Sequence, residues 1–178
     1  MSQYLYLVID LACISVPLIA SFYKKAAFYK EWKYFFPANL IVAIIFLIWD
    51  EIFTRNGVWG FNPDYLVGIY LGELPLEEIL FFICIPYACV FTYFAFKYLL
   101  PSSIREYNKT WINYLLMILA FVVALISTDK IYTFVTASSA TLFFLWAAIK
   151  KENLTLLNLS YLAIIPFFLI SNGLLTGS

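Results

Sequence analysis

Residues 78–100 read EILFFICIPYACVFTYFAFKYLL, and this stretch decides the class of fold. Its two charged side chains, Glu78 and Lys97, lie near its ends, and every residue between them is uncharged. A helix of about 20 such residues crosses the ~30 Å hydrocarbon layer of a membrane. Residues 78–100 therefore predict a transmembrane helix.

The composition of the whole chain is that of a membrane protein. Of its 178 residues, 64% are hydrophobic, 21% are aromatic and only 12% are charged, whereas about 25% of a soluble domain is charged. The mean hydropathy is +0.89. With 11 basic and 11 acidic side chains the net charge is zero, so the chain lacks the basic surface typical of nucleic-acid binding. We expect an integral membrane protein in contact with the lipid bilayer and no nucleic-acid partner.

Several kinds of catalytic site are excluded by the residue types present. Histidine is absent, which removes histidine-based triads and histidine metal sites. No GxGxxG, Walker, CxxC or HExxH motif occurs, which disfavours a bound nicotinamide or flavin in a Rossmann fold. The three cysteines, Cys13, Cys84 and Cys89, lie in apolar runs and read as small core side chains. We expect no metal and no cofactor.

Six apolar stretches are long enough to cross or nearly cross the bilayer. They are residues 4–22, 36–49, 78–100, 111–127, 131–149 and 154–175. The first has no basic leading region and no small-residue cleavage pattern, so we interpret it as a retained helix and not as a signal peptide. We expect an all-α membrane protein in which residues 1–178 form a single six-helix transmembrane bundle.

The basic residues alternate between the loops. Nine of the 11 follow the first, third and fifth stretches, and only Arg55 and Lys130 lie on the other side. The nine are Lys24, Lys25, Lys30, Lys33, Lys97, Arg105, Lys109, Lys150 and Lys151. Because cytoplasmic loops carry an excess of lysine and arginine, this pattern puts the N-terminus outside. We expect a location in a bacterial inner membrane.

Two helix ends resemble each other. Residues 47–54 read LIWDEIFT and residues 169–176 read LISNGLLT, and both follow a lysine-bearing loop. Matching topology makes a duplication plausible, built from a tandem three-helix repeat. In this interpretation residues 1–100 are the first repeat, residues 101–128 are a linking helix, and residues 129–178 are an incomplete second repeat.

The segment between the second and third stretches, residues 49–82, is both acidic and aromatic. It holds six carboxylates against one base, Arg55, together with eight aromatic residues. The carboxylates are Asp50, Glu51, Asp64, Glu73, Glu77 and Glu78. Glycine, asparagine and proline at 57, 60, 62 and 63 predict irregular backbone. Such backbone is stable at membrane depth only when it is buried against protein or lines a cavity.

Two interpretations of the glutamates at 77 and 78 remain open. Pro75 fits the first position of a helix, and acids in a first turn complement the helix dipole without further function. Alternatively, Glu77 and Glu78 meet Asp50 and Glu51 at the end of the neighbouring helix, where like charge and loss of hydration favour a protonated carboxyl group. Asp10 lies two turns inside the first stretch. It either joins this site or lies near the outer membrane interface, where its carboxyl group reaches water or binds a neighbouring backbone.

This combination of residues suits one kind of chemistry and permits another. A local acid, an apolar surrounding and aromatic faces that attract a cation permit the proton-initiated isomerisation of a hydrocarbon. The same acids also permit a proton-coupled membrane carrier. A carrier needs acids at mid-membrane on several helices, whereas these cluster near one interface, which favours the isomerase.

The sequence resembles the small membrane lycopene cyclases, the heterodimeric or fused type of bacteria, archaea and fungi. The resemblance covers nearly the whole chain. The motifs that carry it are Trp49-Asp50, Phe53-Thr54, Gly57-Val58-Trp59, Phe61-Asn62-Pro63, Tyr65, Gly68-Ile69, Leu74-Pro75-Leu76-Glu77-Glu78, Leu80-Phe81-Phe82 and Ile85-Pro86. Later landmarks are Asp129-Lys130, Tyr132-Thr133 and residues 172–177.

The resemblance implies an enzyme of carotenoid biosynthesis that cyclises the ψ ends of lycopene to β-ionone rings without net redox change. It implies Glu77, Glu78 and Asp50 as catalytic residues, with Glu77 or Glu78 as the acid. It also implies a substrate-binding pocket formed by Trp59, Phe61, Asn62, Phe81 and Phe82.

One departure from the family pattern concerns the C-terminal part. Fused members carry a second acidic motif before a seventh helix, and this sequence ends where that portion is expected to begin. We therefore expect either a truncated chain or a homo- or hetero-oligomer that supplies the second motif. The alternative function is a non-catalytic subunit of a heteromeric cyclase.

Overall fold

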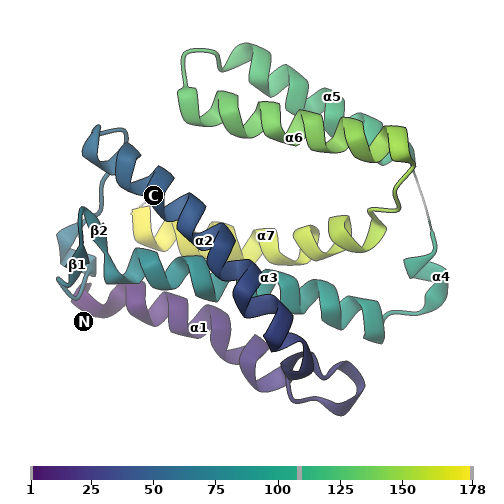
Figure 1. Cartoon of the computed structure of the whole chain (residues 1–178), viewed down its shortest axis with the longest axis horizontal. Helices are drawn as coiled ribbons and strands as arrows, with labels where there is room; N and C mark the ends of the chain where they lie inside the picture. Colours follow the sequence, from purple (N-terminus) through teal and green to yellow (C-terminus); the bar gives the residue numbers. More distant parts are fainter. Residues whose placement is uncertain (1, 108–109, 177–178) are drawn as a thin grey trace. The chain divides into compact units, whose positions relative to one another are not determined.

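The computed structural model describes residues 2–107 and 110–176 (Figure 1). Lys109, Gly177 and Ser178, which enter the sequence predictions, lie outside this part. Its helices are α1 (Leu5–Ala20), α2 (Trp32–Arg55), α3 (Leu76–Leu99), α4 (Ser102–Arg105), α5 (Thr110–Ile126), α6 (Ile131–Lys150) and α7 (Thr155–Thr176). The strands are β1 (Tyr70–Leu71) and β2 (Leu74–Pro75).

Each of the six predicted apolar stretches overlaps one long helix, so the prediction of an all-α protein is confirmed. The single six-helix bundle is not confirmed, because the chain divides into two compact units. Residues 1–99 with 160–178 form the first unit, and residues 100–159 form the second. Hydropathy alone located the helices but could not show which of them pack together.

Within residues 2–107 and 110–176, four helical segments are long and apolar enough to cross a membrane. They are Lys24–Arg55, Leu76–Leu99, Ile131–Lys150 and Thr155–Gly173, and the shorter apolar helices are Leu5–Ala20 and Thr110–Ile126. Many large apolar side chains point outward, such as Ile19 and Ile149. An exposed surface of this kind suits lipid and not water, so the chain is an integral membrane protein.

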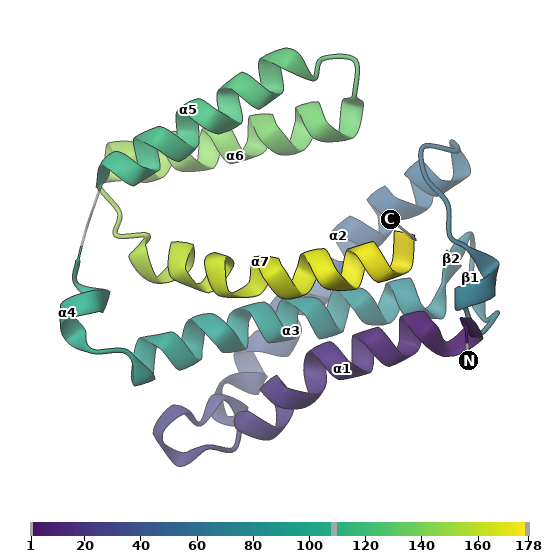
Figure 2. The same ribbon diagram turned by 180° about the vertical axis from the view of Figure 1, so that it is seen from behind.

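In the first unit, α3 is the central helix. It packs along α1 and is crossed by α2 (Figures 1 and 2). α1 and α3 run in the same direction, because contacts join both their first turns and their later turns. The lysines at 24, 25, 30, 33 and 97 therefore gather at one end of this unit, and Glu77 and Glu78 lie at the other.

An aromatic core closes the lysine-bearing end of the unit. Phe28, Phe35 and Tyr87 are buried together. The Tyr87 hydroxyl group lies 2.6 Å from the Ser21 hydroxyl group and accepts a 2.9 Å hydrogen bond from the Trp32 indole N–H. This end of α3 is thus fixed to α1 and α2 by a paired polar group inside an apolar core.

Replacing Tyr87 by phenylalanine is expected to lower the free energy of unfolding by about 1–3 kcal/mol, because Ser21 and Trp32 lose a buried hydrogen-bond partner. Thermal unfolding of the purified protein in detergent measures the effect. Tyr161→Phe, at an exposed position of α7, is the matched control and should leave the midpoint unchanged. Equal midpoints for both variants would contradict the prediction.

A small hairpin, which the sequence analysis did not predict, leads into α3. Strands β1 and β2 are antiparallel, with Tyr70 opposite Pro75. Gly72 turns between them with φ of +68°, and the Glu51 carboxylate accepts a 3.0 Å hydrogen bond from the Glu73 backbone N–H. Two residues per strand are too few for the alternating pattern by which strands are recognised.

We expect Gly72→Ala to destabilise this hairpin by about 1–3 kcal/mol, because a side chain is strained at positive φ. An added Cβ would also lie 2.6 Å from Glu51 Oε1. Gly60→Ala is the control, since nothing lies within 4 Å of its Cβ position and its φ is not positive. Unfolding midpoints in detergent compare the two, and similar midpoints would contradict the expectation.

The second unit is a helical hairpin of α5 and α6, which lie side by side (Figures 1 and 2). Its buried side chains include Ala124, Ala137 and Ala147, and such small residues let membrane helices approach closely. The Asn113 side-chain amide donates a 3.1 Å hydrogen bond to the Glu152 carbonyl oxygen. This contact fixes the start of α5 to the turn after α6.

Candidate functional site

Four carboxyl groups and one phenol converge in the first unit, and we call Tyr6, Asp10, Asp50, Glu77 and Glu78 the acid cluster. The Tyr6 hydroxyl group donates a hydrogen bond to Glu78 Oε2. Asp10 interacts electrostatically with both glutamates, and Asp50 interacts with Glu78. Helices α1, α2 and α3 each contribute to the cluster. Asp50 meets Glu78, as the sequence predicted, whereas the neighbour of Glu77 in the cluster is Asp10.

The helix boundaries explain why these side chains meet. α3 begins at Leu76, directly after Pro75, so Glu77 and Glu78 occupy its first turn. Tyr6 and Asp10 are the buried residues of α1 and lie one turn apart on the same face. Asp50 lies near the end of α2. The three helices thus bring their ends together at the side of the unit opposite the lysines.

Burial leaves several carboxyl oxygens of the cluster without a partner. Asp10 and Glu77 are 0% exposed, and Asp50 is 5% exposed. Within the described part of the chain, neither oxygen of Asp10 has a hydrogen-bond partner, nor have Asp50 Oδ2 and Glu77 Oε2. Because buried polar atoms are nearly always paired, unpaired acids inside a membrane protein mark a functional site.

Aromatic rings border the cluster. The Trp59 indole N–H donates a 2.7 Å hydrogen bond to Asp50 Oδ1. Its ring stacks on Phe53 at 4.9 Å between centroids. On the other side, the Phe81 ring meets the Tyr6 ring edge to face at 6.4 Å. Trp59 and Tyr6 thus contact the acids through their polar groups, and Phe53 and Phe81 pack against these two rings. The faces of such rings attract a nearby positive charge.

The predicted pocket residues fall into two groups. Trp59 and Phe81 border the acid cluster, as described above. Phe82 instead stacks on Phe46 of α2 at 6.1 Å between centroids. Phe61 is half-buried in the loop, and the exposed Asn62 accepts a 3.0 Å hydrogen bond from the Asp64 backbone N–H, which caps the turn Pro63–Tyr65.

Glu51 has its hydrogen-bond partners outside the cluster, which differs from the predicted convergence with Asp50, Glu77 and Glu78. Its Oε1 forms an ion pair with Arg55 Nε at 2.7 Å, and its Oε2 accepts a hydrogen bond from the Glu73 backbone N–H. Adjacent residues on a helix point about 100° apart, so Asp50 turns inward and Glu51 turns toward the hairpin.

Tyr6 is the member of the site that sequence reasoning missed. A signal was present, because Tyr6 precedes Asp10 by four residues and so shares its helix face. A phenol in the first turn of an apolar helix reads as an interfacial anchor, and only the position of α3 beside α1 shows its partner to be Glu78.

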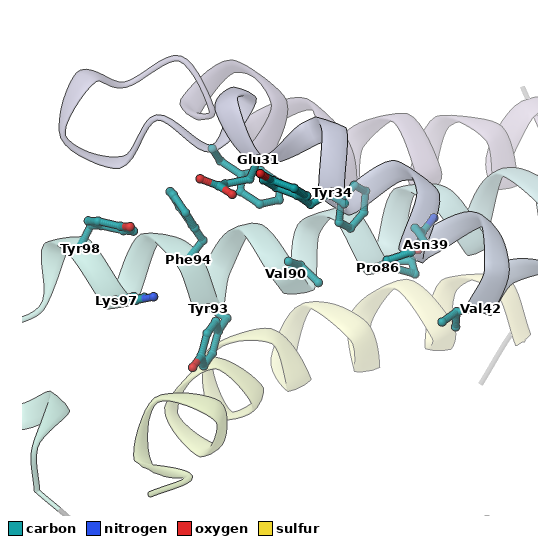
Figure 3. A pocket seen from close by; sticks show the side chains of 13 residues that line it. Glu31, Tyr34, Asn39, Val42, Pro86, Val90, Tyr93, Phe94, Lys97 and Tyr98 are labelled. Atoms are coloured by element: carbon teal, nitrogen blue, oxygen red, sulfur yellow. The ribbon is translucent and has the colours of Figure 1, made fainter.

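A second feature of the same unit is a groove of about 600 Å³ between α2 and α3 (Figure 3). Its lining is mainly aromatic and aliphatic, and Glu31 and Lys97 lie at its lysine-bearing end (Figure 3). The lining residues are Phe28, Glu31, Tyr34, Phe35, Ala38, Asn39, Val42, Pro86, Val90, Tyr93, Phe94, Lys97 and Tyr98. No carboxyl group of the acid cluster is among them, so the groove is a separate apolar surface.

Comparison with known families matches residues 3–96 and 129–178 to the family described as lycopene cyclase. The chain belongs to the lycopene cyclase family. The first matched stretch of this family contains every residue of the acid cluster. The resemblance noted from the sequence is therefore confirmed.

Curated relatives carry the same family name. Residues of the chain are 34% identical over 56 positions to a bifunctional lycopene cyclase/phytoene synthase of Aspergillus niger, covering 32% of this chain and 10% of that one. They are 34% identical over 71 positions to the enzyme of the same name from Arthroderma gypseum, covering 38% and 12%. The matches thus span about a tenth of each relative's length. No solved structure matches the chain.

Proposed function

We propose that this lycopene cyclase family member cyclises the ψ ends of lycopene to β-ionone rings. The observation that carries the proposal is the acid cluster, in which four carboxyl groups meet beside aromatic rings inside an apolar helical unit. A site without water suits a carbocation, because water would capture the cation before the ring closes.

The reaction is an isomerisation in which protons balance. A carboxylic acid gives its proton to the terminal double bond, and a tertiary carbocation forms at the substituted carbon. The double bond nearer the middle of the chain attacks this cation, which forms one carbon–carbon bond and closes a six-membered ring. A carboxylate then removes a ring proton, which restores one double bond. No electron is gained or lost overall, so no redox cofactor enters this scheme.

The side chains of the acid cluster divide these tasks. As the family motif implies, Glu77 or Glu78 is the proposed proton donor and Asp50 a second catalytic carboxyl group. A carboxylate of the cluster removes the ring proton. Trp59 and Phe81 lie where a cation beside the acids would meet a ring, and such contacts contribute about 0.5–2 kcal/mol each. Phe61, Asn62 and Phe82 remain proposed substrate contacts through the loop and the start of α3.

The groove between α2 and α3 is the proposed binding surface for the remaining hydrocarbon chain. It lies on the same two helices that carry Asp50 and Glu78, nearer their lysine-bearing end. Its aromatic and aliphatic lining buries an apolar chain, as most small-molecule pockets do. The stacked pair Phe46–Phe82 lies between the acids and the groove along these helices.

Filling the groove with Val90→Trp is expected to raise KM for lycopene by at least about tenfold, because a large ring at the centre of the lining excludes part of the chain. Ile41→Trp, on an exposed face of α2 outside the groove, is the matched control. Initial rates in detergent micelles at several lycopene concentrations give KM for both. An unchanged KM in the Val90 variant would show that the hydrocarbon chain of lycopene does not bind in this groove.

Expression in lycopene-accumulating cells tests the proposed function. The wild-type chain is expected to convert lycopene to γ-carotene or β-carotene, which chromatography separates. The double variant Glu77→Gln, Glu78→Gln is expected to accumulate lycopene only, whereas Asp64→Asn, an exposed carboxylate outside the cluster, should behave as wild type. Unchanged products from the double variant would refute the acid cluster as the site.

The same experiment separates a complete cyclase from a subunit. Conversion only after co-expression with a second chain would identify the protein as a subunit of a hetero-oligomer and not as an enzyme active by itself. A homo-oligomer and a tandem three-helix repeat, with residues 1–100, 101–128 and 129–178 as its parts, remain proposals.

The proposed orientation puts the N-terminus and the acid cluster on the outer face of a bacterial inner membrane. Support comes from the five lysines at the opposite end of the first unit, since cytoplasmic ends are enriched in basic residues. Reporter fusions after Lys150 and after Arg55 test this orientation. A cytoplasmic signal from the Arg55 fusion would reverse it.

A further inference from the structure

Glu77 and Glu78 are neighbours in sequence but have different surroundings. Glu77 is 0% exposed, and its Oε1 accepts a 2.6 Å hydrogen bond from the Val67 backbone N–H. Glu78 is only half-buried, and its Oε2 accepts a hydrogen bond from the Tyr6 hydroxyl group. A carboxyl group must be accessible to protonate a substrate, and Glu78 is the more accessible of the two.

The contact of Glu77 is of a structural kind. Val67 belongs to the loop between α2 and α3, which also carries Trp59 and the hairpin. The neighbouring Leu66 is buried, and the Leu76 backbone N–H donates a 2.8 Å hydrogen bond to the Ile69 carbonyl oxygen. Glu77 therefore fixes the middle of this loop to the first turn of α3.

The contact of Glu78 is suited to charge development. When a carboxylic acid protonates a double bond, a negative charge appears on its oxygens. The Tyr6 hydroxyl group already donates to Oε2, and a fixed donor aimed at a developing charge stabilises it with little reorganisation. The edge-to-face contact of the Tyr6 ring with Phe81 holds the phenol in place.

We propose that Glu78 is the acid that protonates the terminal double bond, that Tyr6 is a positioning residue that stabilises the resulting carboxylate, and that Glu77 anchors the loop to α3. This assignment rests on the proposed function and deepens it. In the catalytic cycle the proton leaves Glu78 for the substrate carbon, and a ring proton returns to the same carboxylate. Tyr6 keeps its own proton throughout.

Tyr6→Phe tests the positioning role, since it removes one hydroxyl group and keeps the ring against Phe81. For the purified protein in lycopene-containing micelles, kcat is expected to fall roughly 10- to 100-fold with KM unchanged. Tyr4→Phe, at an exposed neighbouring position, is the matched control. A kcat equal to that of wild type would overturn the role of Tyr6.

Single glutamine variants test the division between the two glutamates. Glu78→Gln is expected to fold with the wild-type midpoint and to form no cyclised product. Glu77→Gln is expected to lower the unfolding midpoint and to keep measurable turnover. The opposite pattern, an inactive but equally stable Glu77 variant beside an active Glu78 variant, would overturn the assignment.

Infrared spectroscopy separates failure of this assignment from failure of the proposed function. Tyr6→Phe should shift a carboxyl band that Glu78→Gln abolishes, and the shift needs no substrate. If wild type makes no cyclised product, either by itself or with a second chain, yet the band shifts, the Tyr6–Glu78 pair is retained and the proposed reaction is refuted. If wild type is active and no band shifts, the reaction is retained and the pair is refuted.

Discussion

Replacing Asp10 by leucine is expected to raise the stability of the protein and to reduce its cyclisation rate. Asp10 is fully buried in α1, and within the described residues neither of its carboxyl oxygens has a hydrogen-bond partner. Leucine has the same branched shape without polar atoms. Replacing buried charged groups by apolar groups of similar shape often stabilises a protein by about 1–4 kcal/mol.

The expected loss of activity follows from the neighbours of Asp10. Its carboxyl group interacts with Glu77 and Glu78, so leucine changes the electrostatic surroundings of the proposed acid. We expect the cyclisation rate to fall at least about tenfold. A group that costs stability and is needed for activity is typical of a functional site.

Thermal unfolding in detergent and pigment analysis together measure the Asp10 effect. Asp64→Leu is the control, because Asp64 is exposed and outside the acid cluster. A lower unfolding midpoint for Asp10→Leu would show that Asp10 stabilises the fold. A more stable variant with full activity would remove Asp10 from the functional site.

Trp59→Phe is expected to impair both stability and cyclisation. The substitution deletes the 2.7 Å hydrogen bond from the indole N–H to Asp50 Oδ1. Among the described residues Asp50 Oδ2 has no hydrogen-bond partner. Without the indole, this buried carboxyl group would keep only its interaction with Glu78. Leaving a buried charged acceptor unpaired costs about 1.5–3 kcal/mol.

The catalytic part of the Trp59 effect comes from the ring itself. Tryptophan attracts a cation more strongly than phenylalanine does, with a difference on the order of 1 kcal/mol. Together with a displaced Asp50, this predicts a cyclisation rate at least about tenfold lower. Trp146→Phe, at an exposed position of α6, is the control for loss of an indole. Wild-type rates and midpoints for Trp59→Phe would show that the Trp59–Asp50 contact has no role.

The helices of this protein could be predicted from sequence because hydropathy is a property of each stretch alone. The start of α3 could be predicted in the same way, since Pro75 and two acids in a first turn are local signals. Local signals do not determine which side chains face each other. The hairpin of Tyr70–Pro75 was not predicted because its strands are too short for an alternating pattern. The division into two units was not predicted because it depends on contacts between distant residues.

In the acid cluster, too, the sequence indicated the residues but not the partner of each side chain. The motif indicated both Glu77 and Glu78, but one residue step on a helix turns a side chain by about 100°. That turn sends Glu77 to the Val67 amide and Glu78 to Tyr6. The packing of α1 against α3 decides which partner each glutamate meets. The sequence of residues 74–82 by itself gives no information on this packing.

The position of Asp10 also has a consequence for how the protein enters the membrane. Asp50, Glu77 and Glu78 lie near helix ends, whereas Asp10 lies inside α1. An aspartate at the centre of a membrane helix opposes insertion by the translocon by about 2.5–3.5 kcal/mol. The contacts of α1 with α3 shield this residue only after residue 99 has been synthesised. We therefore expect α1 to integrate stably during biosynthesis only when α3 arrives, so that the first three helices partition into lipid as one assembly.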